Sequence, residues 1–314
     1  PFSRPPPMTE PDAYSYPRYL DAKKTVDARA LNRRVWTRFS DRLSERTAPI
    51  EILEVGAGVG ATLQRIVEAL EGAPPARLHY TFVDLEPENV VAARDALRGW
   101  AAHRGYQVAD HDRQVWTDDA LEVSIRFVTG DLFDVVEGLD DGAFDAVVAQ
   151  AVLDLLHLPA ALRALRPLLR SGGLWYLPIH FDGLTAFEPP MEAALDARIE
   201  RLYHTSMSEP PAEGERPAGM HCGRRLLSRL PEAGIPLLDT GSSDWIVLPR
   251  DGAYPGDEAY FLHHILHFVE TELSGHPELD ASAFERWVRA RRRQIDDGEL
   301  IYIAHQLDVL AQTP

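Results

Sequence analysis

Hydrophobic and polar positions follow two alternating patterns along the chain. Short apolar-rich runs, such as Ile50–Val55 and Phe144–Ala149, alternate with stretches whose apolar residues recur every three or four positions, such as Ala61–Leu70. The runs predict buried strands, and the longer spacing predicts amphipathic helices. Strands that alternate with helices predict an α/β fold, in which a doubly wound and mostly parallel sheet is covered on both faces.

The same patterns predict a seven-stranded sheet. The further strands are expected at Leu78–Val83, Val123–Val128, Leu174–Ile179, Trp245–Leu248 and Leu300–Val309. The further helices of the core are expected at Asn89–Trp100, Pro159–Arg170 and Gly223–Leu230. Glycine shortly after the Pro159–Arg170 helix is typical of a helix end.

Three segments depart from this alternation. Residues 1–47 are expected to form an N-terminal arm and helical lid, because apolar residues recur at helical spacing from Leu20 to Glu45, with room for one break. Residues 48–314 are expected to form the main domain. Within it we expect two helical insertions, at about 183–219, which is rich in proline, and at about 251–298.

A glycine-rich turn follows the first predicted strand. Glu54-Val55 leads into Gly56-Ala57-Gly58-Val59-Gly60, and a predicted helix comes next. Glycines in such a turn let backbone N–H groups approach a ligand closely, and dinucleotide-binding enzymes use a related turn. Two details favour another ligand. The spacing is G-x-G-x-G, and the carboxylate of Glu54 can reach an ammonium group, which NAD does not possess.

Two further acids follow the next predicted strands. Asp84 ends the second strand, where a carboxylate can accept hydrogen bonds from both hydroxyls of a ribose. Asp131 follows the third strand, where it can accept from an adenine amino group while Leu132 offers its backbone N–H to the ring. Aspartate is also common wherever a strand turns into a helix. Three glycines and three acids in this order favour a nucleoside site.

This ordered set resembles the class I S-adenosylmethionine (SAM)-dependent methyltransferases over about residues 50–182. The resemblance implies that SAM is the cofactor and that the acids hold its ammonium group, ribose and adenine. The implied cofactor-binding residues are Glu54, Gly56, Ala57, Gly58, Gly60, Asp84, Leu85, Asp131, Leu132 and Gln150. The resemblance also implies a reversed C-terminal strand at the sheet edge, formed with the last two predicted strands. Ser171 departs from the family, which usually has proline before this Gly-Gly pair.

The chemistry is expected beyond the carboxyl ends of the strands, where ligands bind in open α/β sheets. His180, just after the fifth strand, is the first candidate for a base or substrate contact. Asp154 and His157 lie three positions apart after the fourth strand and are catalytic candidates that can share a helix face. Each histidine can instead cap a helix or contact a backbone carbonyl.

Aromatic residues near the predicted lid and the first insertion are candidates for substrate binding. Tyr14 and Tyr19 precede or begin the N-terminal helix and can close over the cofactor as part of a lid. Tyr203 and His204 end the predicted insertion helix and can reach the same site. A packed arm with no moving part is the alternative for the two N-terminal tyrosines.

The composition of the chain argues against several classes of partner. The net charge of −17 argues against nucleic acid, and no apolar run approaches the length of a membrane span, roughly 20 residues. The single cysteine, Cys222, suits a reducing cytoplasm. Lys23 and Lys24 are the only lysines, and every other basic residue is arginine. His263 and His267 form an i,i+4 pair, but without an H-E-x-x-H motif or a nearby cysteine we predict no metal site.

The sequence therefore predicts a cytoplasmic SAM-dependent methyltransferase that acts on a small-molecule acceptor, with oxygen slightly favoured as the acceptor atom. Two alternatives stay open. One is a non-catalytic SAM-binding regulatory or partner subunit, because binding and catalysis need different residues. The other, less favoured, is an NAD-dependent dehydrogenase. A homodimer is also left open.

Overall fold

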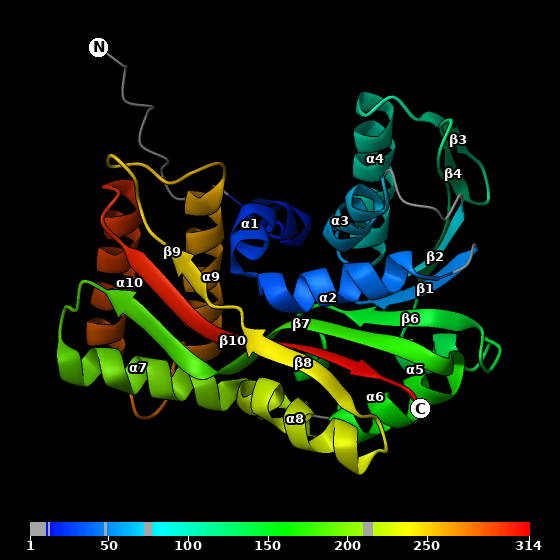
Figure 1. The fold of residues 1–314 in the computed structure, drawn as a ribbon. Coiled ribbons are helices and arrows are strands. Elements are labelled where there is room, and N and C mark those ends of the chain that lie inside the picture. The colour runs from blue at the N-terminus through cyan, green and yellow to red at the C-terminus, as the bar shows by residue number, and fades with distance from the viewer. Residues whose placement is uncertain (1–10, 12, 47–48, 72–76, 210–215) are drawn as a thin grey trace.

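One sheet runs through the molecule, and helices lie on both of its faces and over one of its ends (Figure 1). The structure is a computed structural model that describes residues 11, 13–46, 49–71, 77–209 and 216–314. The start of the predicted arm, residues 1–10, and residues 210–215 of the first predicted insertion lie outside the described residues. The predicted α/β class is confirmed.

Ten strands form the sheet, in the order β3-β4-β5-β2-β1-β6-β7-β10-β8, and β9 pairs with β10. The strands are β1 Ile50–Val55, β2 Arg77–Asp84, β3 Gln107–Asp110, β4 Gln114–Thr117, β5 Glu122–Thr129, β6 Phe144–Ala149, β7 Leu169–Glu188, β8 Leu237–Ser242, β9 Trp245–Val247 and β10 Ile301–Gln312. The central strands β5, β2, β1, β6 and β7 pair in parallel, so their carboxyl ends meet along one edge.

The edges of the sheet differ from the prediction of seven strands with a reversed strand at one edge. The reversed strand, β10, lies between β7 and β8 and is antiparallel to both. The edge strand β8 reads Leu-Leu-Asp-Thr-Gly-Ser, and the β3–β4 hairpin at the other edge is also largely polar. Strands near a solvated edge need no continuous apolar pattern, which is why the sequence did not reveal these three.

The helices agree with the sequence pattern in most places. They are α1 Tyr16–Ala30, α2 Arg33–Ser44, α3 Ala61–Leu70, α4 Pro87–His103, α5 Leu132–Val136, α6 Leu158–Leu165, α7 Ala193–Ser206, α8 Cys222–Glu232, α9 Glu258–Leu273 and α10 Ala281–Asp296, with short 3₁₀ helices η1 Leu153–Leu155, η2 Arg166–Leu168 and η3 Gly219–His221. The predicted helix over Pro159–Arg170 is wrong at its end, because Pro167 has no N–H and β7 begins at Leu169. No described helix combines the length and apolarity needed to cross a membrane.

Strand β7 connects the sheet to the helices over its end. It is 20 residues long and pairs with β10 along most of its length. Its path changes at Ile179, which has a φ of 58°, and at Gly183, which has a φ of 82°. Helices α7, α9 and α10 lie beside the C-terminal half of β7 and the N-terminal half of β10, which pair with each other (Figure 1). These halves are called the far ends of the two strands below.

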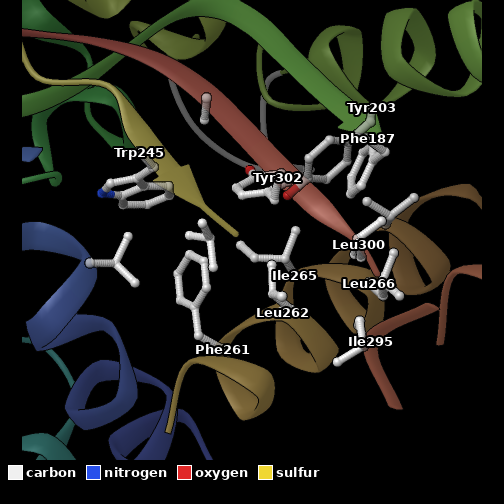
Figure 2. Close-up of a cluster of buried hydrophobic side chains, with 14 of the residues drawn as sticks. Phe187, Tyr203, Trp245, Phe261, Leu262, Ile265, Leu266, Ile295, Leu300 and Tyr302 are labelled. Carbon is white, nitrogen blue, oxygen red and sulfur yellow. The ribbon is translucent and has the colours of Figure 1, made fainter. Parts of the chain in front are cut away.

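The hydrophobic core is divided among three clusters. One lies on the sheet face covered by α2, α3 and α4, and a second lies on the face covered by α6 and α8. The third joins α1, α7, α9 and α10 to the far ends of β7, β9 and β10. Figure 2 shows this third cluster, with Trp245 from β9, Tyr302 from β10, Tyr203 from α7 and Ile265 from α9. Because this cluster lies next to the carboxyl ends of the parallel strands, several of its side chains form walls of the cavity described next.

Candidate cofactor and acceptor site

A cavity of about 820 Å³ lies at the carboxyl ends of β1, β2, β5 and β6. Volumes of this order are typical of sites for small molecules and cofactors. One half of the cavity is lined by the glycine turn and the strand ends, and the other half by α1, α7, α9 and the far ends of β7 and β10. The cavity therefore extends continuously from the predicted nucleoside site to the third hydrophobic cluster.

The glycine turn needs its glycines for different reasons. Gly56, Gly58 and Gly60 have φ values of 62°, 57° and 79°, which L-residues rarely adopt. A Cβ at Gly56 would lie 2.5 Å from Val152, and Gly56, Ala57 and Gly58 line the cavity. Gly60 does not line it; this residue precedes the first turn of α3 and packs close to Leu97. Gly60 thus shapes the turn without facing the cavity.

Glu54 ends near the floor of the cavity and is only 1% exposed. Its Oε2 accepts a hydrogen bond from the hydroxyl of Tyr80 at 2.7 Å. Burial raises the pKa of Glu54 to about 7, although the hydrogen bond from Tyr80 acts in the opposite direction. A cationic ligand group next to this carboxyl would stabilise its ionised form.

Asp84, at the end of β2, organises the turn as well as lining the cavity. Its Oδ2 accepts from the backbone N–H of Gly58 at 2.7 Å, and its Oδ1 accepts from the N–H of Glu86 and from Asn89 Nδ2, both at 3.0 Å. A carboxylate has about four acceptor positions, so about one remains for a ligand hydroxyl. Leu85 beside it is 59% exposed and lines the cavity.

Asp131 and Leu132 lie together at the start of α5 and line the cavity. Oδ1 of Asp131 accepts a hydrogen bond from the backbone N–H of Phe133 at 2.8 Å, which caps the helix. Asp131 thus caps α5 through Oδ1, and its other carboxylate oxygen takes no part in the cap. The residue can serve both the helix and a ligand.

Gln150 connects the cofactor half of the cavity to α1. Its Oε1 accepts from Arg65 at 2.6 Å and from Thr62 at 3.2 Å, and its Nε2 donates to Asp27 at 2.8 Å. Asp27 also accepts from Lys23 Nζ and from Trp245 Nε1, each at 2.9 Å. This buried network joins α1, α3, β9 and the end of β6.

The structure separates the two catalytic candidates after β6. Asp154 lines the cavity, and burial raises its pKa to about 6. Its Oδ1 has no hydrogen-bond partner among the described residues. His157 does not line the cavity; it precedes the first turn of α6, whereas Asp154 belongs to η1. The expectation of a shared helix face is wrong, because the chain turns between them.

His180 lies away from the cavity, contrary to expectation. The strand residues on either side, Ile179 and Phe181, line the cavity, whereas His180 is fully buried outside it. Its Nδ1 is 3.3 Å from the carbonyl oxygen of Leu177, and burial lowers its pKa to about 4. Since successive side chains of a strand point to opposite faces, His180 cannot reach a ligand in the cavity in this arrangement.

Two of the four substrate-binding candidates line the cavity. Tyr19 and Tyr203 are both buried in its walls, and Tyr19 stacks on His264 with ring centroids 4.6 Å apart. Tyr14 instead stacks on His267 at 4.0 Å and does not line the cavity. His204 also lies behind the wall, with its ring 5.4 Å from that of Phe181. The latter two predictions are therefore not supported as direct contacts.

Sequence reasoning missed several cavity residues that come from distant segments. They are Lys23 and Asp27 from α1, Trp245 from β9, Ile265 and Phe268 from α9, and Tyr302 and Gln306 from β10. The one available signal was that Lys23 belongs to the only pair of lysines in the chain. Within the part of the chain that the structure describes, no group of three or more His, Cys, Asp or Glu side chains is arranged to hold a metal ion.

Comparison with known proteins identifies the domain. Residues 53–175 match the family model described as a methyltransferase domain, and this range contains the glycine turn and the acids that follow β2 and β5. Residues 53–175 thus form a methyltransferase domain. SAM is accordingly the cofactor of this methyltransferase domain.

Curated relatives match parts of this chain. It is 44% identical over 68 residues to the non-reducing polyketide synthase tazA of Aspergillus terreus, which is 21% of this chain and 2% of that protein. It is 28% identical over 139 residues to the methyltransferase calH of Penicillium decumbens, which is 43% of this chain and 32% of that protein. The chain thus spans less than a third of the length of these relatives.

Solved structures of methyltransferases are also similar. A geranyl diphosphate C-methyltransferase from Streptomyces coelicolor A3(2) has a TM-score of 0.43 and 12% sequence identity, covering 90% of this chain and 76% of that one. The trans-methyltransferase CalH, solved with S-adenosylhomocysteine (SAH), has a TM-score of 0.43 and 17% identity, covering 88% and 55%.

The residues present in the cavity fit SAM chemically. Glu54 offers a carboxyl group for an ammonium group, and Asp84 and Asp131 each keep acceptor capacity for hydroxyl and amino donors. The oxygen Oδ1 of Asn89, also in the cavity wall, has no partner among the described residues. The missing Cβ of Gly56 makes room for the side chain of Val152, and both residues line the cavity.

Proposed function

We propose that this methyltransferase domain methylates a small-molecule acceptor, at an oxygen atom, in the half of the cavity formed by α1, α7 and α9. The observation that carries the proposal is the continuity of the cavity. It begins at the glycine turn and extends to a wall made of Phe181, Tyr203, Trp245 and Tyr302. This wall suits an acceptor with an apolar or aromatic body.

Different residues of the chain bind the cofactor and limit the access of water. When bound, SAM supplies a methyl group on a sulfonium, so that the acceptor oxygen gains a C–O bond while the C–S bond breaks and its electron pair stays on sulfur. Glu54, Asp84 and Asp131 bind and orient the cofactor. Helix α1 covers the cavity and limits the access of water, which strengthens the polar contacts inside.

Asp154 is the residue that we propose to take the proton of an acceptor hydroxyl. It lines the cavity and has an unpartnered Oδ1 among the described residues. Burial raises its pKa to about 6, so the carboxylate form prevails at neutral pH and can still accept a proton. Asp154 takes over the role first considered for His180, whose ring lies outside the cavity.

A turnover assay with a matched pair of variants tests the function. The protein is incubated with SAM and pooled small molecules, and formation of SAH is measured. Asp84→Asn removes the charged acceptor at the ribose position, and we expect SAH to bind about 10- to 100-fold more weakly. Asp95→Asn is the control, because the Asp95 side chain is 64% exposed on α4 and faces Arg98.

The outcomes separate catalysis from binding. Formation of SAH that depends on one pool component supports the proposal and identifies the acceptor. Tight binding of SAH without turnover in any pool would instead favour a non-catalytic SAM-binding subunit. Equal SAH affinity in both variants would contradict the proposed ribose contact, and NADH serves as the control nucleotide that should not bind.

A further inference from the structure

Lys23 is placed unlike any other basic side chain of the protein. The chain has 32 lysine and arginine residues, of which only Lys23 and Lys24 are lysines. Lys23 lies in the cavity wall at 7% exposure and is the only lysine or arginine that lines the cavity among the residues described. Lys24 instead pairs with Asp21, which is 67% exposed. A lysine carries a compact point charge with three donors, which differs from the planar fork of arginine.

The Lys23 ammonium keeps unused donor capacity. Its Nζ donates to Oδ2 of Asp27 at 2.9 Å and lies 5.3 Å from the ring centroid of Trp245. No other hydrogen bond of this ammonium is found among the described residues, whereas it has three N–H groups. Buried donors without acceptors are costly, so the remaining N–H groups are suited to a ligand oxygen in the cavity.

Asp27 holds Lys23 and is itself fully engaged. Its carboxylate accepts from Lys23, Gln150 and Trp245, which come from α1, the end of β6 and β9. The carboxylate is 3% exposed, so these three donors use most of its acceptor capacity. Asp27 is therefore a positioning residue rather than a base. Of the two side chains, the ammonium of Lys23 is the one left to donate hydrogen bonds to a ligand.

The neighbouring tyrosines can donate hydrogen bonds to a ligand but do not act as bases. Tyr19 and Tyr203 line the same half of the cavity, and both are buried. Burial raises the pKa of both phenols above the ordinary value of 10.0, so both hydroxyls stay protonated. An acceptor with a charged or polar oxygen would find complementary donors on this side.

We propose that Lys23 binds the acceptor through an anionic oxygen, so that the acceptor class is an aromatic or apolar molecule bearing a carboxylate, an acidic phenol or an enol. This inference rests on the proposed function of the domain and names the chemistry of its acceptor. The apolar body lies against the aromatic wall, and the oxygen lies at the Lys23–Asp27 pair. The hydrogen bonds of Gln150 then connect the Lys23–Asp27 pair to α3, the helix that follows the glycine turn.

Lysine labelling gives a direct test, because the chain contains only two lysines. Protein made with ¹³Cε-lysine should give two side-chain NMR signals, and Lys24→Met assigns them by removing one. With SAH present, 2-naphthoate is added, followed in separate samples by the neutral 2-naphthamide and the cation 2-naphthyltrimethylammonium. We expect naphthoate to bind best and to shift the Lys23 signal without moving that of Lys24.

Affinity measurements on variants complete the test. Lys23→Met should bind 2-naphthoate about 10- to 100-fold more weakly, because it loses a charge-assisted hydrogen bond. Lys24→Met should bind it with unchanged affinity, and both variants should keep their affinity for SAH. If Lys23→Met does not fold, the NMR experiment on the unsubstituted chain still decides.

Two results would overturn the inference. One is that naphthoate leaves the Lys23 signal in place or does not bind. The other is that the cationic probe binds more tightly than naphthoate, which would indicate a cationic acceptor held by the aromatic wall. Failure of SAH to bind in the same samples would instead contradict the proposed function, so the two failures are distinguishable.

Discussion

The acids that line the cavity differ in how much of their hydrogen-bonding capacity the protein already uses. Asp27 and Asp84 each accept three hydrogen bonds from protein donors. Glu54 accepts one from Tyr80, and Oδ1 of Asp154 has no partner among the described residues. The first two acids are thus mainly organising residues, and the last two have the most capacity left for ligands and protons.

Cofactor affinity should depend on pH through Glu54. Its pKa is raised to about 7, so below that pH the carboxyl group is protonated and cannot pair with the ligand's ammonium group. We expect SAH affinity, measured by calorimetry, to fall by about tenfold per pH unit below pH 7, since one proton must leave.

The Glu54→Gln variant is the control for this profile. It should bind SAH more weakly at pH 8 and lose the acid-side dependence. Without ligand, the folded wild type keeps a proton between pH 4.5 and about 7 that the unfolded chain has released. Its stability relative to the variant should therefore decrease as pH rises through this range. Parallel affinity profiles in the two proteins would refute the assignment.

Gly56 carries a prediction about the backbone of the turn. Gly56→Ala would place a Cβ 2.5 Å from Val152 at a φ of 62°, so we expect a loss of stability of about 1–3 kcal/mol and weaker SAH binding. Gly99→Ala is the matched control, because a Cβ there meets nothing within 4 Å in the helix α4. That variant should be stabilised by about 1 kcal/mol, as judged by urea unfolding.

At the scale of secondary-structure elements, α1 is a fixed wall of the cavity. Glu258 at the start of α9 is fully buried and accepts hydrogen bonds from Thr25 and from both terminal nitrogens of Arg29, one of them at 2.8 Å. The backbone N–H of Ser15 also donates to the hydroxyl of Tyr260 on α9. These contacts favour the packed arm over a freely moving lid.

Removing one partner of this buried contact should loosen α1. Arg29→Met leaves Glu258 buried with only Thr25 as a partner, and we expect a loss of about 1–3 kcal/mol. Amide exchange in α1 should accelerate, and SAH affinity should decrease because α1 covers the cavity. Arg18→Met, which removes an exposed pair with Asp257, should cost less than about 1 kcal/mol. Equal effects of both substitutions would contradict the account.

The sequence predicted elements best where the core imposes a strong pattern. The bounds of β1, α3 and β6 agree with the predicted Ile50–Val55, Ala61–Leu70 and Phe144–Ala149. The two strands are buried at the centre of the sheet, and the buried face of α3 belongs to the core cluster on one side of it. The sequence failed at β8, which has polar residues and glycine near the sheet edge. Periodicity reports burial, and it weakens where a strand is half exposed.

The cofactor half of the site was also more predictable than the acceptor half. Glu54 and Asp84 lie at the ends of β1 and β2, and Asp131 follows β5. Because these three strands are parallel neighbours, the three acids lie along one edge of the sheet. The acceptor half brings together Lys23 and Trp245, which are more than two hundred positions apart. This contact depends on the pairing of β9 with β10 and on the packing of α1 against β9, which the local pattern does not encode.

At the scale of the whole molecule, the two predicted insertions pack together as one accessory layer. Asp196 on α7 accepts hydrogen bonds from Trp287 at 2.6 Å and from Arg291 at 2.8 Å, both on α10. Its other oxygen accepts from the backbone N–H groups of Met191 and Glu192. Arg291 is completely buried, so this contact joins segments far apart in the sequence within the third hydrophobic cluster.

Disrupting this contact should impair the proposed acceptor half of the cavity and leave SAH binding in the other half intact. Asp196→Ala leaves the Arg291 guanidinium buried without its carboxylate, which costs about 3–5 kcal/mol. Because the accessory layer forms the acceptor half and the strand ends form the cofactor half, exchange should rise in α7 and α10 while SAH binding persists. Methyl transfer should be lost.

The control is Arg201→Ala, which removes an exposed ion pair between α7 and Glu278. Both side chains of that pair are 54% exposed, so the loss should stay below about 1 kcal/mol and turnover should persist. If Asp196→Ala abolished SAH binding and turnover together, the layer would be needed to fold the nucleoside site. Retained SAH binding with lost turnover would indicate that the parallel sheet holds the cofactor independently and that the accessory helices provide the acceptor site.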